Sequence, residues 1–136
     1  MGLPKKIILI DDSFTTNFLN QMVIQKSKYD QPVETFQNPE DAVTSIQIEH
    51  ADSSELLIFV DINMPVLDGW QVVQRLEEIG IVQQNVIVML TSSIDPKDQQ
   101  RALDSSAIHD FRTKPLTIEM LDEIIGNHFF PESSLL

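Results

Sequence analysis

The sequence predicts an α/β fold: a five-stranded parallel, doubly wound sheet with helices on both faces, built as (βα)5. Apolar runs alternate with amphipathic stretches along all 136 residues, which is the pattern of consecutive βα units. The run from Leu56 to Val60 has no polar residue in alternate positions, as expected for a strand covered on both faces. Several of these runs end in acidic, hydroxyl or basic residues, which a parallel sheet would bring to one edge.

The first two βα units follow from their apolar runs and helix caps. A strand is expected from Lys5 to Ile10, followed by a helix for which Ser13 is the cap. In this helix the apolar residues recur at helical spacing: Phe14, Phe18, Leu19, Met22 and Val23. A short strand near Val33 to Phe36 precedes a helix with Asn38 as its cap and Pro39 in its first turn, where a missing N–H is tolerated.

The third and fourth units are separated from the second by a polar loop from about Glu49 to Ser54. The strand from Leu56 to Val60 leads to a helix from Gly69 to about Glu78. The strand from Val86 to Leu90 leads to a helix that starts at Asp95-Pro96. This fourth helix has few apolar residues, so we expect it to be the most loosely anchored one.

The fifth unit ends the fold. Its strand, near Asp110 to Thr113, is weak by itself, and its helix starts near Thr117. The chain from Pro131 onwards, residues 131–136, is expected to fray. We therefore expect one domain over residues 1–136, with a core at about 5–129 and no output domain.

Composition limits the kind of partner. The formal net charge is −12, from 9 basic and 21 acidic residues, which argues against nucleic acid or an anionic membrane surface as the main partner. No apolar stretch approaches the roughly 20 residues of a membrane-spanning helix. The chain has no cysteine, which excludes disulfides and zinc–thiolate sites and fits a cytoplasmic location.

The strand ends carry the chemistry. Asp11 and Asp12 follow the first strand, Asp61 the third, Thr91 the fourth and Lys114 the fifth. Taken singly, each has an ordinary explanation as a turn residue, a helix-dipole partner or a solvated side chain. Taken together, three carboxylates, a hydroxyl and an ammonium at one edge suit a divalent cation and a phosphoryl group.

The acidic residues indicate Mg²⁺, which takes oxygen ligands in an octahedron and keeps several waters. Asp12, Asp61 and the backbone carbonyl of Asn63 can supply three positions, and Asp11 can hold a metal-bound water. Zinc is disfavoured because none of the histidines is next to the cluster in sequence: His50, His109 and His128.

The same set accommodates phosphoryl transfer. A carboxylate can act as the nucleophile and form an aspartyl phosphate. The transition state spreads negative charge over three equatorial oxygens. Mg²⁺ would contact one of them, Lys114 a second and Thr91 a third.

Four segments together resemble the receiver domain of two-component response regulators, and most closely the single-domain, chemotaxis-regulator type. They are Ile8 to Ser13, Asp61 to Gly69, Leu90 to Ser92 and Thr113 to Pro115. The resemblance covers about residues 5–129. It implies a flavodoxin-like sheet and Mg²⁺-dependent phosphorylation.

The resemblance also implies roles and partners. Asp61 would accept a phosphoryl group from a phosphohistidine on a histidine kinase or a histidine phosphotransfer protein. Asp11 and Asp12 would be the acidic pair of the metal site, Thr91 the switch hydroxyl and Lys114 the phosphate contact.

Phe111 falls at the position of the family's switch aromatic. The surface of the fourth helix, fifth strand and fifth helix would then signal to a downstream protein target, or the phosphoryl group would be relayed to another histidine. We expect a monomer or weak dimer that binds neither nucleic acid nor membrane directly.

Two alternatives remain. A phosphatase of the haloacid-dehalogenase-like type needs a second aspartate, two residues after the nucleophile, as its general acid and base. This chain has Asn63 at that position. A constitutive interaction module would not need Asp61, Thr91 and Lys114 together. We therefore expect no enzymatic turnover beyond self-phosphorylation and autodephosphorylation.

Overall fold

The computed structural model describes residues 2–50, 55–82 and 85–130. Within these residues, one sheet holds five parallel strands in the order β2-β1-β3-β4-β5. The strands are β1 (Lys6–Ile10), β2 (Val33–Phe36), β3 (Leu56–Val60), β4 (Val86–Thr91) and β5 (Asp110–Thr113). The helices are α1 (Phe14–Lys26), α2 (Pro39–His50), α3 (Gly69–Glu78), α4 (Pro96–Asp104) and α5 (Ile118–Phe129). The predicted fold class is confirmed.

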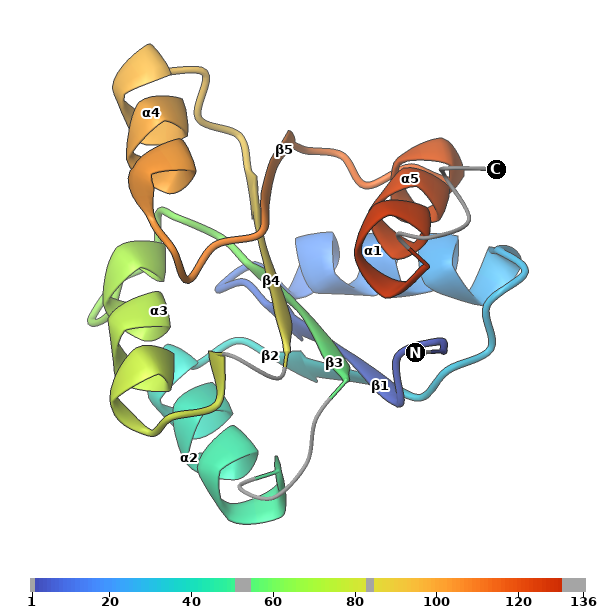
Figure 1. Cartoon of the computed structure of the whole chain (residues 1–136), viewed down its shortest axis with the longest axis horizontal. Helices are drawn as coiled ribbons and strands as arrows, with labels where there is room; N and C mark the ends of the chain where they lie inside the picture. The colour runs from blue at the N-terminus through green and yellow to red at the C-terminus, as the bar shows by residue number, and fades with distance from the viewer. Residues whose placement is uncertain (1, 51–54, 83–84, 131–136) are drawn as a thin grey trace.

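Helices cover both faces of the sheet (Figure 1). Alternate residues of β1 face opposite ways: Ile8 and Ile10 pack in a cluster with residues of α2 and α3, and Ile7 and Leu9 in a cluster with residues of α1 and α5. Two apolar layers therefore enclose the central strands, which explains why their sequences show no alternation. Among the described residues, no helix is both long enough and apolar enough to cross a bilayer.

The helix boundaries agree closely with the sequence. Ser13 caps α1 by accepting the N–H of Thr16, and the side chain of Asn38 accepts the N–H of Glu40 at the start of α2. The second helix runs to His50, so the predicted loop begins later than Glu49. Residues 51–54 of that loop and the tail from residue 131 lie outside the described residues.

Helix α1 is present as predicted, but three of the five apolar residues at helical spacing lie outside its buried face. Phe14, Phe18 and Leu19 are 66%, 52% and 54% exposed, whereas Asn17 and Asn20 are only 3% and 6% exposed. The Asn17 amide donates to main-chain carbonyls at the ends of β1 and β2, which turns this face of the helix towards the sheet. The first half of the helix therefore presents apolar side chains to solvent and amides to the sheet, whereas Ile24 near its end packs in the core.

Candidate functional site

The carboxyl ends of the strands bring the sequence-predicted residues to one edge of the sheet. Carboxylate oxygens of Asp11, Asp12 and Asp61 lie within 4.8 Å of one another. Asp61 follows β3, and its N–H donates to the carbonyl of Ile10 at the end of β1 over 3.0 Å. The parallel register is therefore what joins the acidic pair to the third aspartate.

Lys114 reaches the same cluster from the end of β5. Its Nζ lies 2.5 Å from Oδ2 of Asp11 and 3.4 Å from Oδ1 of Asp61. The Lys114–Pro115 bond is cis. Asp11 is held at its other oxygen as well, because Oδ1 accepts the N–H of Ser13 over 2.9 Å. One ammonium thus bridges two buried carboxylates.

Asp61 is buried among like charges. Burial raises the pKa of Asp61, the negative charge of Asp11 raises it further, and the ammonium of Lys114 acts in the opposite direction. The charged form of Asp61 is therefore less favourable here than in water. A second cation beside the cluster would lower this pKa and favour the carboxylate.

The donor set fits a hard divalent cation. All three side chains offer carboxylate oxygens, the ligands that Mg²⁺ prefers. Asp11 and Asp61 are buried while Asp12 is exposed, so a cation at this edge can keep water ligands on its outer side. Asn63 is exposed in the loop after β3, and the use of its carbonyl as a ligand stays a prediction.

The loop between β3 and α3 is packed tightly against Asp61. A Cβ atom on Gly69 would lie 2.3 Å from the carbonyl oxygen of Asp61 and 2.8 Å from Cα of Ile62. The N–H of Gly69 donates to the Ile62 carbonyl over 2.8 Å. Asp68 caps α3 in a capping box with Gln71, so this helix begins at Gly69 as predicted. Only glycine allows this approach of α3 to the acidic cluster.

Thr91 is the last residue of β4 and is fully buried. Its Oγ1 accepts the N–H of Ser93 over 3.1 Å, and its carbonyl accepts the N–H of Lys114 over 2.8 Å. Thr91 therefore connects the end of β4 to the lysine of the site. Its role as a switch hydroxyl stays a prediction.

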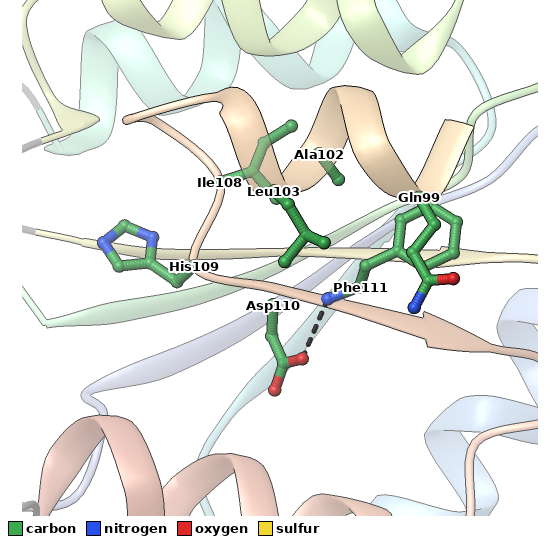
Figure 2. A pocket seen from close by; sticks show the side chains of 7 residues that line it. All are labelled: Gln99, Ala102, Leu103, Ile108, His109, Asp110 and Phe111. Atoms are coloured by element: carbon green, nitrogen blue, oxygen red, sulfur yellow. Dashed lines mark hydrogen bonds between the residues drawn. The ribbon is translucent and has the colours of Figure 1, made fainter. Parts of the chain in front are cut away.

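Phe111 is partly buried beside a cavity of about 320 Å³ between α4 and β5. Figure 2 shows its ring turned towards α4, close to Gln99, while Asp110 points away from that helix. Of the residues of α4, all described, Ala102 alone is buried, as its polar sequence predicts. Phe111 therefore has space to move beneath a weakly anchored helix.

Asn17 was not among the site residues predicted from the sequence. The side chain lies beneath the acidic pair, and its Nδ2 donates to the carbonyl of Asp11 over 2.9 Å. An asparagine within an apolar periodic pattern is ordinarily taken to face solvent. The sequence signal that could have identified Asn17 is its position six residues after Asp11.

Comparisons with known proteins agree with this geometry. Residues 7–126 match the response regulator receiver domain family. The chain is 28% identical over 118 residues to "Two-component response regulator 24" of Arabidopsis thaliana, covering 87% of this chain and 79% of that protein. A two-component response regulator from Cytophaga hutchinsonii has a similar structure, with a TM-score of 0.85, 25% identity, and 93% and 97% of the two chains covered.

Several relatives are much longer than the segment they share with this chain. The chain is 32% identical over 115 residues to an alkaline phosphatase synthesis transcriptional regulatory protein of Bacillus subtilis, covering 85% of this chain and 44% of that protein. It spans 15% of the length of a gliding motility regulatory protein of Myxococcus xanthus, to which it is 28% identical over 88% of this chain. The similarity therefore concerns only the matched part of each of these proteins.

Proposed function

The chain belongs to the response regulator receiver domain family, and we propose that Asp61 is the residue on which it is phosphorylated. Phosphorylation-activated signalling is the general function of this family. The observation that carries the assignment is the position of Asp61, buried beside two other carboxylates and 3.4 Å from Lys114. Asp61 is the one of the three that directly follows the central strand β3.

The chemistry is the transfer of a phosphoryl group from nitrogen to oxygen. A carboxylate oxygen of Asp61 attacks the phosphorus of a phosphohistidine, the P–O bond forms as the P–N bond breaks, and the imidazole leaves with the bonding electron pair. Lys114 already touches Asp11 and Asp61. Its ammonium can therefore stabilise negative charge on the phosphoryl oxygens with little movement.

Receiver domains bind Mg²⁺ at an acidic pocket, and we propose that Asp11, Asp12, Asp61 and the carbonyl of Asn63 hold it here. When bound, the ion supplies positive charge that neutralises the cluster and the incoming phosphoryl group. The raised pKa of Asp61, caused by burial and by Asp11, supports a need for such a charge.

Receiver domains interact with histidine kinases or phosphotransfer proteins and with downstream targets. The exposed rings of Phe14 and Phe18 stack 6.3 Å apart at the start of α1, which follows Asp12 closely in sequence. They support docking of an apolar surface of the phosphodonor next to the site. A cytoplasmic location and a monomeric or weakly dimeric state belong to the same proposal.

The output is a change in the surface of α4, β5 and α5. Phosphorylation adds strong acceptor oxygens near Thr91, whose hydroxyl turns towards them and leaves space that Phe111 fills. Moving a two-state equilibrium from 1:99 to 99:1 takes about 5.5 kcal/mol. A few charge-assisted hydrogen bonds of about 1.5–3 kcal/mol each supply that difference. The changed surface then addresses a separate target, or the phosphoryl group passes to another histidine.

Receiver domains generally catalyse nothing beyond their own autodephosphorylation, and we propose the same for this chain. Asn63, two residues after Asp61, cannot shuttle a proton as the aspartate of a phosphatase does. Continuous release of phosphate from an added phosphate ester would contradict this.

Labelling with a small acyl phosphate tests the assignment. We expect the wild-type protein to be labelled in the presence of Mg²⁺ and not after its removal. The Asp61→Asn variant should not be labelled, whereas a control, Asp30→Asn, changes an exposed carboxylate elsewhere and should behave as wild type. Equal labelling of Asp61→Asn and wild type would refute the proposal.

A further inference from the structure

Helix α1 buries two asparagines where an apolar residue would be expected. Asn17 and Asn20 are nine-tenths or more buried, and their side chains lie on the face turned to the sheet. A buried side-chain amide is unfavourable unless its polar atoms are hydrogen-bonded. Their position directly behind the acidic cluster suggests that the amides serve it.

The Asn17 amide holds the main chain of the acidic pair. Its Nδ2 donates to the carbonyl of Asp11 over 2.9 Å and to the carbonyl of Phe36 over 3.2 Å. The N–H of Asp11 donates to the same Phe36 carbonyl over 3.0 Å. The Asn17 side chain therefore joins the end of β2 to the main chain that follows β1, where the acidic pair begins.

The other end of the Asn17 amide lacks a hydrogen-bond partner. Its Oδ1 is buried and accepts no hydrogen bond from the described residues. Asn17 also lines a cavity of about 10 Å³, which has four polar side chains in its lining, those of Asp11, Asn17, Asn20 and Asp61. That volume is about the space that one water molecule needs, and the lining offers the two to four polar partners that a buried water uses.

We propose that Asn17 positions the acidic pair for cation binding, and that Asn17 and Asn20 together bind one water molecule behind the carboxylates of Asp11 and Asp61. The water donates one hydrogen to Oδ1 of Asn17 and the other to a neighbouring carboxylate. Outer partners of this kind orient the groups that bind a metal. This inference rests on the proposed Mg²⁺ site and adds to it the residues that hold its ligands in place.

Magnesium titration of the unphosphorylated protein by calorimetry tests the positioning role. Asn17→Leu keeps the approximate shape and removes both the donor and the acceptor. We expect its Mg²⁺ affinity to fall by about 10-fold or more, and that of Asn20→Leu, which fills the cavity, to fall as well. Gln25→Leu, on the exposed face of the same helix, should leave the affinity unchanged.

The unfolding temperature, measured on the same samples, separates the two possible roles of Asn17. Asn17→Leu protein that unfolds at a lower temperature but binds Mg²⁺ as wild type does would show a structural role only, and would overturn the inference. A wild-type protein that binds no Mg²⁺ would instead refute the proposed cation site itself. The two failures are therefore distinguishable.

NMR on the wild-type protein keeps the inference testable if the variants do not fold. We expect a nuclear Overhauser effect between a long-lived water and the side-chain amide hydrogens of Asn17 and Asn20. We also expect the Asn17 side-chain amide resonances to shift when Mg²⁺ is added. Absence of the water contact would overturn the bound water, and unchanged amide resonances would overturn the positioning role.

Discussion

Replacing Gly69 by alanine should damage the site without touching a charged residue. The added Cβ would lie 2.3 Å from the carbonyl oxygen of Asp61, a separation at which neither atom can remain in place. To restore even 3.0 Å, the two must separate by 0.7 Å (3.0 − 2.3). The atom in the way is main chain, so the displacement passes directly to the proposed phosphoacceptor.

The size of the effect follows from that displacement. A misplacement of about 1 Å at a reacting group can slow a reaction by about 100-fold, so we expect labelling of Gly69→Ala to be about 10- to 100-fold slower. Overpacking of this kind typically destabilises by about 1–3 kcal/mol. With an unfolding entropy of about 2.1 cal/mol/K per residue over 136 residues, the unfolding temperature should fall by about 4–10 °C.

The assay is a time course of acyl-phosphate labelling together with thermal unfolding. Gly126→Ala is the matched control, because a Cβ at that position in α5 meets nothing within 4 Å. Alanine there should stabilise the helix by about 0.5–1 kcal/mol and leave the labelling rate unchanged. A Gly69→Ala variant as stable and as rapidly labelled as wild type would refute the reasoning.

Three further predictions concern charge and strain. Mg²⁺ at about 100 times its dissociation constant should raise the free energy of unfolding by about 2.7 kcal/mol; Asp12→Asn should need more Mg²⁺ for the same rise, and equal Mg²⁺ dependence of the two proteins would contradict the ligand assignment. Val66 has a φ of 72° and is exposed, so Val66→Gly should stabilise by up to about 1 kcal/mol through relief of left-handed strain; a loss of stability in denaturant unfolding would contradict this. Burial alone would raise the pKa of Asp110, but His128 and Arg112 outweigh it and lower the pKa. Asp110 therefore adds stability that is present at neutral pH and is lost as the pH falls through the lowered pKa. Asp110→Asn should be less stable than wild type at neutral pH and no different at strongly acidic pH, and an equal difference at both would refute the assignment.

The strands and the composition of the site could be predicted because they depend on local signals. Runs such as Leu56 to Val60 are apolar throughout, and only a doubly covered strand buries every residue of such a run. Parallel strands then bring their carboxyl ends together. The residues that follow these strands therefore lie close to one another regardless of the detailed packing. Asp11, Asp61 and Lys114 could be brought together by this argument alone.

The orientation of α1 could not be predicted in the same way. Phe14 and Phe18 recur at helical spacing and suggest a buried face, yet both are exposed. The helix turns Asn17 inward because carbonyls at the ends of two strands accept from its amide, and one of them, that of Phe36, is 19 residues away in sequence. The positive φ of Val66 was equally unforeseeable, because a β-branched residue rarely adopts that conformation and is held there by the surrounding loop.

The most direct test of the central claim is to locate the phosphoryl group chemically. Wild-type protein is phosphorylated in the presence of Mg²⁺ and reduced with borohydride, which converts an aspartyl phosphate to homoserine, and the altered residue is identified by peptide mass spectrometry. Homoserine at position 61, and none at positions 11 or 12, is the predicted result. Homoserine elsewhere, or none in a protein that has consumed the phosphodonor, would contradict the assignment of Asp61 as the phosphoacceptor.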